Sequence, residues 1–260
     1  MNGFAALHHA DTPLLLPNAW DHASAVALAA QGFPAIGTTS LGVAAAAGLS
    51  DGTGDTRDET LLLARRLGNA GFLLSVDAEG GFSDDPGRVA ELARELAGAG
   101  AAGINLEDGR SDGSLTPVGV HAAKIRAVKA AVPGLFVNAR TDTHWLGGHE
   151  AETATRLDAY RQAGADGVFV PGISDPAGIA ALVDSLDVPL NILYSPAGPT
   201  VAELGELGVR RVSLGSLLFR TALGAALAAA ADIRAGRPFP AAQLPTYAET
   251  QALAPAAATR

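Results

Sequence analysis

Short apolar runs alternate with longer Ala/Leu-rich segments along most of the chain. Each run is continuously apolar rather than alternating in polarity, as in parallel strands that are buried on both faces. Glycine recurs just before such runs, as at Gly32, Gly71 and Gly164, where it suits the left-handed residue that ends a helix. The pattern predicts eight strands near Leu14–Leu16, Pro34–Gly37, Leu73–Val76, Gly103–Leu106, Leu135–Asn138, Gly167–Val170, Leu190–Leu193 and Val209–Ser213.

The segments between these runs read as helices. Several helix starts carry a capping residue followed by proline, as in Asp85-Pro86, Thr116-Pro117 and Asp175-Pro176. Eight strand–helix units in succession predict a single-domain (β/α)8 TIM barrel of the α/β class over residues 1–260, whereas a doubly wound open sheet would use fewer repeats. The proline-rich residues 235–260 are expected to dock elsewhere as a C-terminal segment. The predicted helices cover 22–31, 58–69, 87–98, 117–131, 149–163, 176–185, 200–207 and 216–234.

The composition and charge of the chain exclude several classes of function. The 260 residues carry a formal charge of −9, which argues against nucleic acid or an anionic membrane as a partner. The chain contains no cysteine, so disulfides, thiolate nucleophiles and cysteine metal sites are excluded. The first basic residue is Arg57 and the longest charge-free apolar stretch is 221–231. These features predict a cytoplasmic protein with no secretory signal and no membrane span.

Three short motifs do not support the binding or catalytic functions that they suggest at first sight. The GxGxxG match at Gly98–Gly103 closes a predicted helix and precedes a strand, the reverse of a dinucleotide-binding turn. His8-His9 has no acidic partner at helical spacing and is expected to lie in a flexible tail. The two lysines, Lys124 and Lys129, both fall in a predicted helix, so Schiff-base chemistry at a strand end is not expected.

Carboxylates follow neighbouring strands at their carboxyl ends, where barrel enzymes place their active sites. Asp77 and Glu79 end the third strand and Glu107 ends the fourth, while Asp51 lies in the loop after the second. Residues i and i+2 of a strand share a face, so these acids are expected to converge and to repel one another. A hard divalent cation with oxygen ligands, Mg²⁺ or Mn²⁺, would remove that repulsion.

The same ends also carry groups suited to an organic acid. Arg140, at the end of the fifth strand, can grip a carboxylate in a bidentate fork; the alternative is a structural salt bridge to one of the acids. Thr38-Thr39-Ser40 supply hydroxyls and backbone N–H groups. Asn191 is expected to select the distal substrate group. Ser216, at a helix start, is either part of a phosphate corner or an N-cap.

Four segments together resemble the isocitrate lyase/phosphoenolpyruvate mutase superfamily over roughly residues 14–220. They are the stretches 36–40, 75–82, 104–108 and 138–142. The resemblance implies a (β/α)8 barrel whose last helix is swapped between subunits of a homodimer or homotetramer. It implies that Asp77 is the main metal carboxylate, that Asp51, Glu79 and Glu107 bind through waters, and that Thr38, Thr39 and Arg140 hold the 2-oxo acid. It also implies C–C or C–P chemistry through a Mg²⁺-stabilised enolate of pyruvate.

The chain departs from two branches of that family. The Lys-Lys-Cys-Gly-His loop of isocitrate lyases is absent, because there is no cysteine. Phosphonopyruvate-processing members carry Lys-x-Asn-Ser after the fourth strand, whereas the loop 108–116 has neither lysine nor asparagine. Glu79 stands where mutases usually have aspartate. The Gly-rich span Gly109–Gly113 has the composition of a mobile lid or of an ordinary polar loop.

The expected function is a Mg²⁺-dependent carbon–carbon lyase or decarboxylase acting on small 2-oxo or 2-hydroxy di-acids such as oxaloacetate. Decarboxylation needs no strong base, whereas a retro-aldol lyase needs one, for which Asp112, Tyr194 and His144 are weak candidates. The alternatives are a phosphonopyruvate hydrolase or mutase and a non-catalytic 2-oxo-acid-binding protein. The expected catalytic residues are Arg140, Glu107 and Thr39, and the expected substrate-binding residues are Thr38, Thr39, Ser40, Asp77, Arg140 and Asn191.

Overall fold

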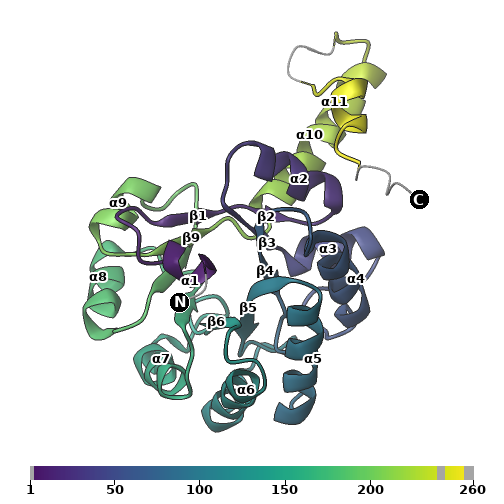
Figure 1. Cartoon of the computed structure of the whole chain (residues 1–260). Coiled ribbons are helices and arrows are strands. Elements are labelled where there is room, and N and C mark those ends of the chain that lie inside the picture. Colours follow the sequence, from purple (N-terminus) through teal and green to yellow (C-terminus); the bar gives the residue numbers. More distant parts are fainter. Residues whose placement is uncertain (1–2, 239–243, 255–260) are drawn as a thin grey trace.

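The computed structural model describes residues 3–238 and 244–254. Its strands form one parallel sheet in the order β1-β9-β8-β7-β6-β5-β4-β3-β2, which curls into the barrel seen in Figure 1. The (β/α)8 prediction is confirmed, and each of the eight predicted strands is present. The strands are β1 (Leu14–Leu16), β2 (Asn18–Ala19), β3 (Ala35–Thr38), β4 (Leu73–Asp77), β5 (Ala101–Glu107), β6 (Phe136–Arg140), β7 (Gly167–Val170), β8 (Leu190–Leu193) and β9 (Arg211–Ser213).

The ninth strand arises because the first barrel strand is interrupted at Pro17. β1 pairs with β9 and β2 pairs with β3, so this broken strand joins the two ends of the sheet. Proline has no N–H to donate to a ladder, but its carbonyl still accepts from Gly37 N at 2.8 Å. The barrel therefore closes through a strand that changes partners at one residue.

The helices follow the predicted pattern, with three additions and one different cap. The Asp85 and Asp175 side chains cap their helices as expected, but Pro117, not Thr116, is the N-cap of the next helix and makes no side-chain bond. The sequence did not indicate α1, α3 and α11. The helices are α1 (Gly3–Leu7), α2 (His22–Ala30), α3 (Ser40–Ala47), α4 (Arg57–Leu67), α5 (Pro86–Gly98), α6 (Val118–Ala131), the 3₁₀ turn η1 (Glu150–Glu152), α7 (Thr153–Gln162), α8 (Pro176–Ser185), α9 (Val201–Glu206), α10 (Leu217–Arg234) and α11 (Tyr247–Gln251).

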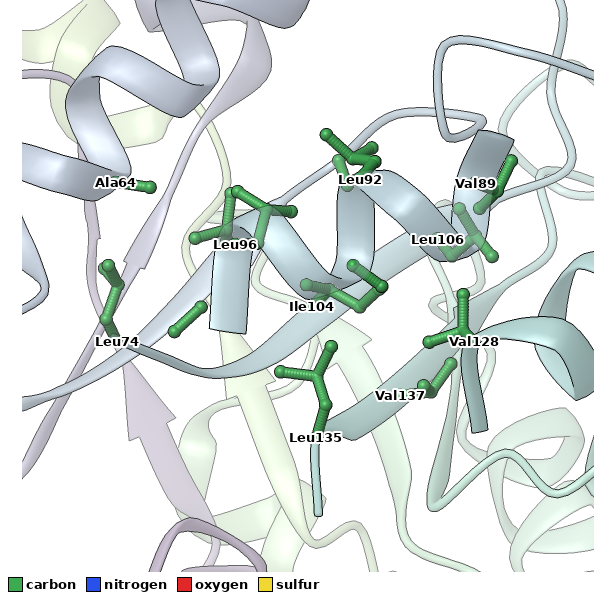
Figure 2. Close-up of a cluster of buried hydrophobic side chains, with 14 of the residues drawn as sticks. Ala64, Leu74, Val89, Leu92, Leu96, Ile104, Leu106, Val128, Leu135 and Val137 are labelled. Atoms are coloured by element: carbon green, nitrogen blue, oxygen red, sulfur yellow. The ribbon is translucent and has the colours of Figure 1, made fainter. Parts of the chain in front are cut away.

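The main hydrophobic core lies between the strands and the surrounding helices. Figure 2 shows Leu92 and Leu96 of α5 and Ile104 and Leu106 of β5 within this core, and all four are buried. Gly100 (φ 99°) allows the chain to turn from α5 into β5, which confirms that the GxGxxG match is a helix end. This packing fixes the strands and hence the direction of the side chains at their carboxyl ends.

The amino-terminal end of the barrel is closed by α1. Phe4 packs with strand residues that include Leu14 and Phe136. His8, just after the helix, is 1% exposed; its ring stacks on Phe136 with centroids 4.2 Å apart, and its Nδ1 lies 2.9 Å from the Phe4 carbonyl oxygen. The expectation of a flexible tail around His8 is therefore wrong. Burial lowers the pKa of His8 to about 3, so the ring is neutral at physiological pH.

The C-terminal elements project from the barrel in Figure 1, where α11 lies beside α10. None of the side chains of α10 is buried, and Leu223 and Leu227 are exposed. His22 Nε2 of α2 lies 3.0 Å from the Leu253 carbonyl oxygen. Parts of the predicted C-terminal segment 235–260 lie outside the described residues. No helix among the described residues combines the length and hydropathy that crossing a membrane requires.

Candidate active site

A cavity of about 120 Å³ opens at the carboxyl ends of the strands. We call it the reaction cavity. It brings together six of the residues that the sequence singled out: Thr39, Ser40, Asp51, Asp77, Arg140 and Ser216. Its other walls are Asn18, Leu41, Asn105, Trp145, Phe169, Pro171, Leu193, Ser213 and Gly215.

Asp77 ends β4 with one carboxylate oxygen engaged and one unpaired. Its Oδ2 accepts a hydrogen bond from Ser40 N at 3.2 Å, while Oδ1 is buried without a hydrogen-bond partner. The backbone N–H of Asp77 donates to Thr38 Oγ1 at 2.8 Å, so Thr38 supports Asp77 from beside the strand. Burial raises the pKa of Asp77, and the nearby charge of Arg140 opposes that shift.

Arg140 ends β6 and is oriented by two other acids. Its Nε and Nη2 donate to the two carboxylate oxygens of Asp142 at 2.6 and 3.1 Å, and its Nη1 lies 2.6 Å from Glu107 Oε2. The bidentate fork predicted for Arg140 therefore holds Asp142, a residue not among the candidates. Burial raises the pKa of Glu107 well above its usual range, although Arg140 opposes the shift. Arg140 thus combines a structural ion pair with a place in the cavity wall.

Glu79 does not line the reaction cavity. It has a positive φ of 46°; Thr56 Oγ1 donates to its Oε1 and Gly54 N donates to Oε2 at 3.3 Å. Burial raises the pKa of its carboxyl. Glu79 and Glu107 both line a second cavity, of about 320 Å³, under the loop 108–116, which we call the loop cavity.

The acids are thus near one another without forming a closed cluster. Within residues 3–238 and 244–254, no three His, Asp or Glu side chains are placed to hold a metal ion together. The donor set still fits a hard cation, because Asp77 offers a buried carboxylate oxygen that lacks a partner. Asp51 lines the reaction cavity, whereas Glu79 and Glu107 line the loop cavity.

The barrel interior beneath the cavity is polar, which the sequence analysis missed. Arg211, at the start of β9, is 1% exposed; its Nε donates to Ser213 Oγ and its Nη2 to Asn105 Oδ1, both at 3.1 Å. Its Nη1 has no hydrogen-bond partner. Asn191, expected to contact substrate, lies in this deeper layer and bonds to Ser213 Oγ at 3.0 Å. Alternation along the strands, in which Ser75 precedes Asp77 and Asn105 precedes Glu107 by two residues, is the signal that could have found this layer.

Replacing Arg211 with methionine is expected to separate stability from anion binding. Burial lowers the pKa of Arg211 to about 9, so the charged form weakens the fold at pH 7, and an apolar side chain of similar volume should leave stability unchanged or raise it by about 1 kcal/mol or more. Oxalate, a small dianion, should bind about tenfold more weakly, because a positive charge beneath the cavity is lost. Thermal unfolding and calorimetry check the two effects. A lower melting temperature with unchanged oxalate affinity would contradict this expectation.

The loop 108–116 forms a small hairpin that is hydrogen-bonded to a neighbouring loop. Gly109 and Leu115 form an antiparallel bridge, and Arg110 Nη2 donates to Asp84 Oδ2 at 2.6 Å. Asp112 lines the loop cavity, where hydrogen bonds from Ser114 lower its pKa. Tyr194 lines a different, adjoining cavity, and His144 lines neither of these nor the reaction cavity. The structure thus brings none of the three candidate bases into the wall of the reaction cavity.

Gly109 lies close to Asp142, the acid that holds Arg140. A Cβ at Gly109 would lie 2.2 Å from Asp142 Oδ2, so Gly109→Ala is expected to displace that carboxylate and loosen Arg140. We expect the affinity for oxalate to fall about tenfold, as for other losses of a supporting group. Gly119→Ala is the matched control, because its Cβ would meet nothing within 4 Å. Equal oxalate affinity of the two variants in calorimetry would show that Asp142 does not position Arg140.

With the geometry established, comparison with known proteins defines the class. The family model described as phosphoenolpyruvate phosphomutase matches residues 4–234. The chain therefore belongs to this family, within the isocitrate lyase/phosphoenolpyruvate mutase superfamily of lyases and mutases, and the resemblance seen in the sequence is confirmed.

Individual relatives differ in their named activities. An uncharacterized protein of Mycobacterium tuberculosis is 46% identical over 96% of this chain and 95% of its own length. A 2-methylisocitrate lyase of Bacillus subtilis is 33% identical over 76% of this chain and 68% of its own. An oxaloacetate decarboxylase of Pseudomonas aeruginosa is 32% identical over 65% and 62%. Among solved structures, a candidate lyase/mutase of Burkholderia cenocepacia has a TM-score of 0.87 at 36% identity, over 96% of this chain and 93% of its own.

Proposed function

We propose that the protein is a Mg²⁺-dependent carbon–carbon lyase or decarboxylase that acts on small 2-oxo or 2-hydroxy di-acids. The observation that carries the proposal is the pairing, in one small cavity, of a buried Asp77 oxygen without a partner and the guanidinium of Arg140. The first suits a hard cation and the second suits a carboxylate. The 2-methylisocitrate lyase and oxaloacetate decarboxylase among the relatives support this substrate class.

The metal would be held by Asp77 directly and by Asp51, Glu79 and Glu107 through waters. Mg²⁺, or Mn²⁺ in its place, supplies a Lewis acid that stabilises negative charge on the 2-oxygen of the substrate. The raised pKa values of Asp77 and Glu107 follow mainly from burial, and a cation at this position would favour their ionised forms.

The chain's own residues bind and orient the substrate. Arg140 is held by Asp142 and Glu107, so its guanidinium is fixed before a substrate carboxylate arrives, which reduces the entropy lost on binding. Thr39 and Ser40 face the 2-oxo acid end in the cavity wall. We assign substrate contact and catalysis to Arg140 and Thr39, and further substrate contact to Ser40 and Asp77. Glu107 and Thr38 are positioning residues, because they contact Arg140 and Asp77.

Decarboxylation of a 2-oxo di-acid fits the cavity better than a base-initiated cleavage. The candidate bases Asp112, Tyr194 and His144 do not line the reaction cavity, and a retro-aldol reaction requires a base for the hydroxyl. Loss of CO₂ from an oxaloacetate-like acid requires only that charge on the 2-oxygen be stabilised. Within the proposed class, a decarboxylase is therefore favoured.

Proton NMR of the purified protein with oxaloacetate tests the proposal. Pyruvate should form well above the slow background of free Mg²⁺, and excess EDTA should abolish the difference. The Asp77→Ala variant with Mg²⁺ sets the background. If oxaloacetate, 2-methylmalate and phosphonopyruvate are each converted no faster than in that background, the enzymatic proposal fails. The function left is then that of a non-catalytic 2-oxo-acid-binding protein. Turnover of phosphonopyruvate alone would instead assign carbon–phosphorus chemistry.

We also propose that the chain forms a homodimer or homotetramer through α10. Leu223 and Leu227 are 50% and 65% exposed on this projecting helix, and a second copy would cover them. Leu227→Asp is expected to shift the protein toward the monomer in light scattering, because an unpaired charge at an apolar interface costs several kcal/mol. Arg234→Gln on the same helix is the control. A monomeric wild-type protein would contradict the proposal.

A further inference from the structure

A larger cavity adjoins the reaction cavity. This side cavity has a volume of about 370 Å³ and shares Leu41, Trp145, Leu193 and Ser216 with the reaction cavity. It extends over the ends of β7, β8 and β9 toward the start of α10. The four shared residues place the side cavity directly beside the reaction cavity.

The walls of the side cavity are mainly apolar. Ile173, Leu214 and Leu217 line it together with the shared Leu41, Trp145 and Leu193. Oxaloacetate has no apolar atoms beyond a single methylene and would leave this volume to water. Pockets that bind small molecules typically combine such walls with a few polar groups that fix orientation.

Among the described residues that line it, the only charged one is Arg220, on the first turn of α10. Its side chain is exposed, and among the described residues the structure gives it no ion pair with an acidic group. An arginine at the rim of an apolar cavity is suited to a carboxylate at the far end of a ligand. Arg220 lies beyond the strand ends, so the strand pattern of the sequence did not indicate it.

We propose that the side cavity is a substrate subsite for an apolar chain on carbon 3 of the 2-oxo acid, with an acidic terminus that pairs with Arg220. This inference rests on the proposed function and deepens it: the substrate is a di-acid substituted on carbon 3 by several methylenes and a distal carboxylate. The 2-oxo acid end lies in the reaction cavity and the chain lies along the apolar wall.

Calorimetry with stable 2-oxo acids, in Mg²⁺ buffer, tests the subsite without turnover. The probes are pyruvate, 2-oxohexanoate and 2-oxoheptanedioate. Each buried methylene contributes up to about fourfold in affinity, so 2-oxohexanoate should bind at least about tenfold more tightly than pyruvate. The terminal carboxylate of 2-oxoheptanedioate should add about two- to fivefold, the range of an exposed ion pair. Affinity that is equal for the three probes, or that falls with length, would overturn the subsite.

Two kinds of variant identify the residues. Arg220→Gln should remove the advantage of 2-oxoheptanedioate over 2-oxohexanoate, whereas Arg234→Gln, farther along α10, should keep it. Leu217→Trp fills the side cavity and should reduce the ratio of 2-oxohexanoate to pyruvate affinity toward one; Ser174→Trp, from a different loop, repeats the test if Leu217→Trp does not fold. A ratio that stays the same in the filled variants would contradict the assignment. If pyruvate itself does not bind, the proposed function fails rather than the subsite.

Discussion

Replacing Asp77 with asparagine is expected to lower kcat/KM by at least about 1000-fold, which corresponds to about 4 kcal/mol of lost transition-state stabilisation. The same substitution should make the metal-free protein more resistant to unfolding. Both effects have one origin: Asp77 Oδ1 is buried without a partner, so its charge is useful only when a cation is bound.

The sign of the stability effect follows from the pKa. Burial raises the pKa of Asp77 above its ordinary value of 3.8, so the folded state holds this proton more tightly than the unfolded state. The contribution of such a group to stability is present at low pH and is lost as pH rises through the raised pKa. Asp77→Asn removes this loss, so the gain in stability should be larger at pH 8 than at pH 4.

Urea denaturation in EDTA at the two pH values measures this gain. Asp187→Asn is the control, because Asp187 is an exposed carboxylate whose side chain is 70% accessible. Asp77→Asn with normal turnover, or with lower stability at pH 8 than the wild type, would show that Asp77 is a structural acid rather than a metal ligand.

Replacing Arg140 with alanine is expected to damage the fold and the site together. Glu107 and Asp142 are both buried and both contact this guanidinium. Removing one partner of a buried pair typically costs about 3–5 kcal/mol, because the remaining charge is uncompensated. Affinity for oxalate should fall about 100-fold or more, since a charged hydrogen-bonding partner of the ligand is lost.

The stability deficit of Arg140→Ala should depend on pH in a defined direction. Arg140 opposes the rise that burial causes in the pKa of Glu107 and Asp142, so both pKa values should rise further in the variant. Protonation then relieves the buried charges, and the deficit relative to wild type should be smaller at pH 5 than at pH 7.5. Urea denaturation at the two pH values measures it, with Arg234→Ala, at an exposed residue, as control. A deficit that is equal at both pH values would mean that these carboxylates are not the cause.

The sequence predicted the barrel and the upper layer of the site because both leave periodic signals. Buried parallel strands are continuous apolar runs, and Asp77, Glu107 and Arg140 stand at their carboxyl ends. The first strand was predicted, but its break at Pro17 depends on which strands flank it, and this is a property of closure rather than of local sequence. The short α3 was missed because its alanine run carries no amphipathic period.

Some residues that shape the core and the site do not lie within the carboxyl ends of the strands, and the sequence did not predict their roles. His8 is part of the core only because Phe136 and α1 meet at the other end of the barrel. Arg211 begins its strand and points into the interior, and Asp142 is defined by its fork with Arg140. The roles of His8 and Arg211 arise from long-range contacts, which a single sequence does not show, whereas Asp142 bonds a residue only two positions away. Asn191 was expected at the substrate, yet it lies one layer below, bonded to Ser213.

Calorimetric titration of oxalate most directly tests the central claim that Asp77 and Arg140 form a metal-dependent site for a 2-oxo acid. Oxalate is a planar dianion that resembles the enolate of pyruvate, and sites built for a charged intermediate bind such mimics tightly. We expect wild-type protein to bind oxalate in Mg²⁺ and not in EDTA, and Asp77→Asn to bind it in neither. Oxalate binding that is equal with and without Mg²⁺, or that is retained by Asp77→Asn in Mg²⁺, would contradict the account.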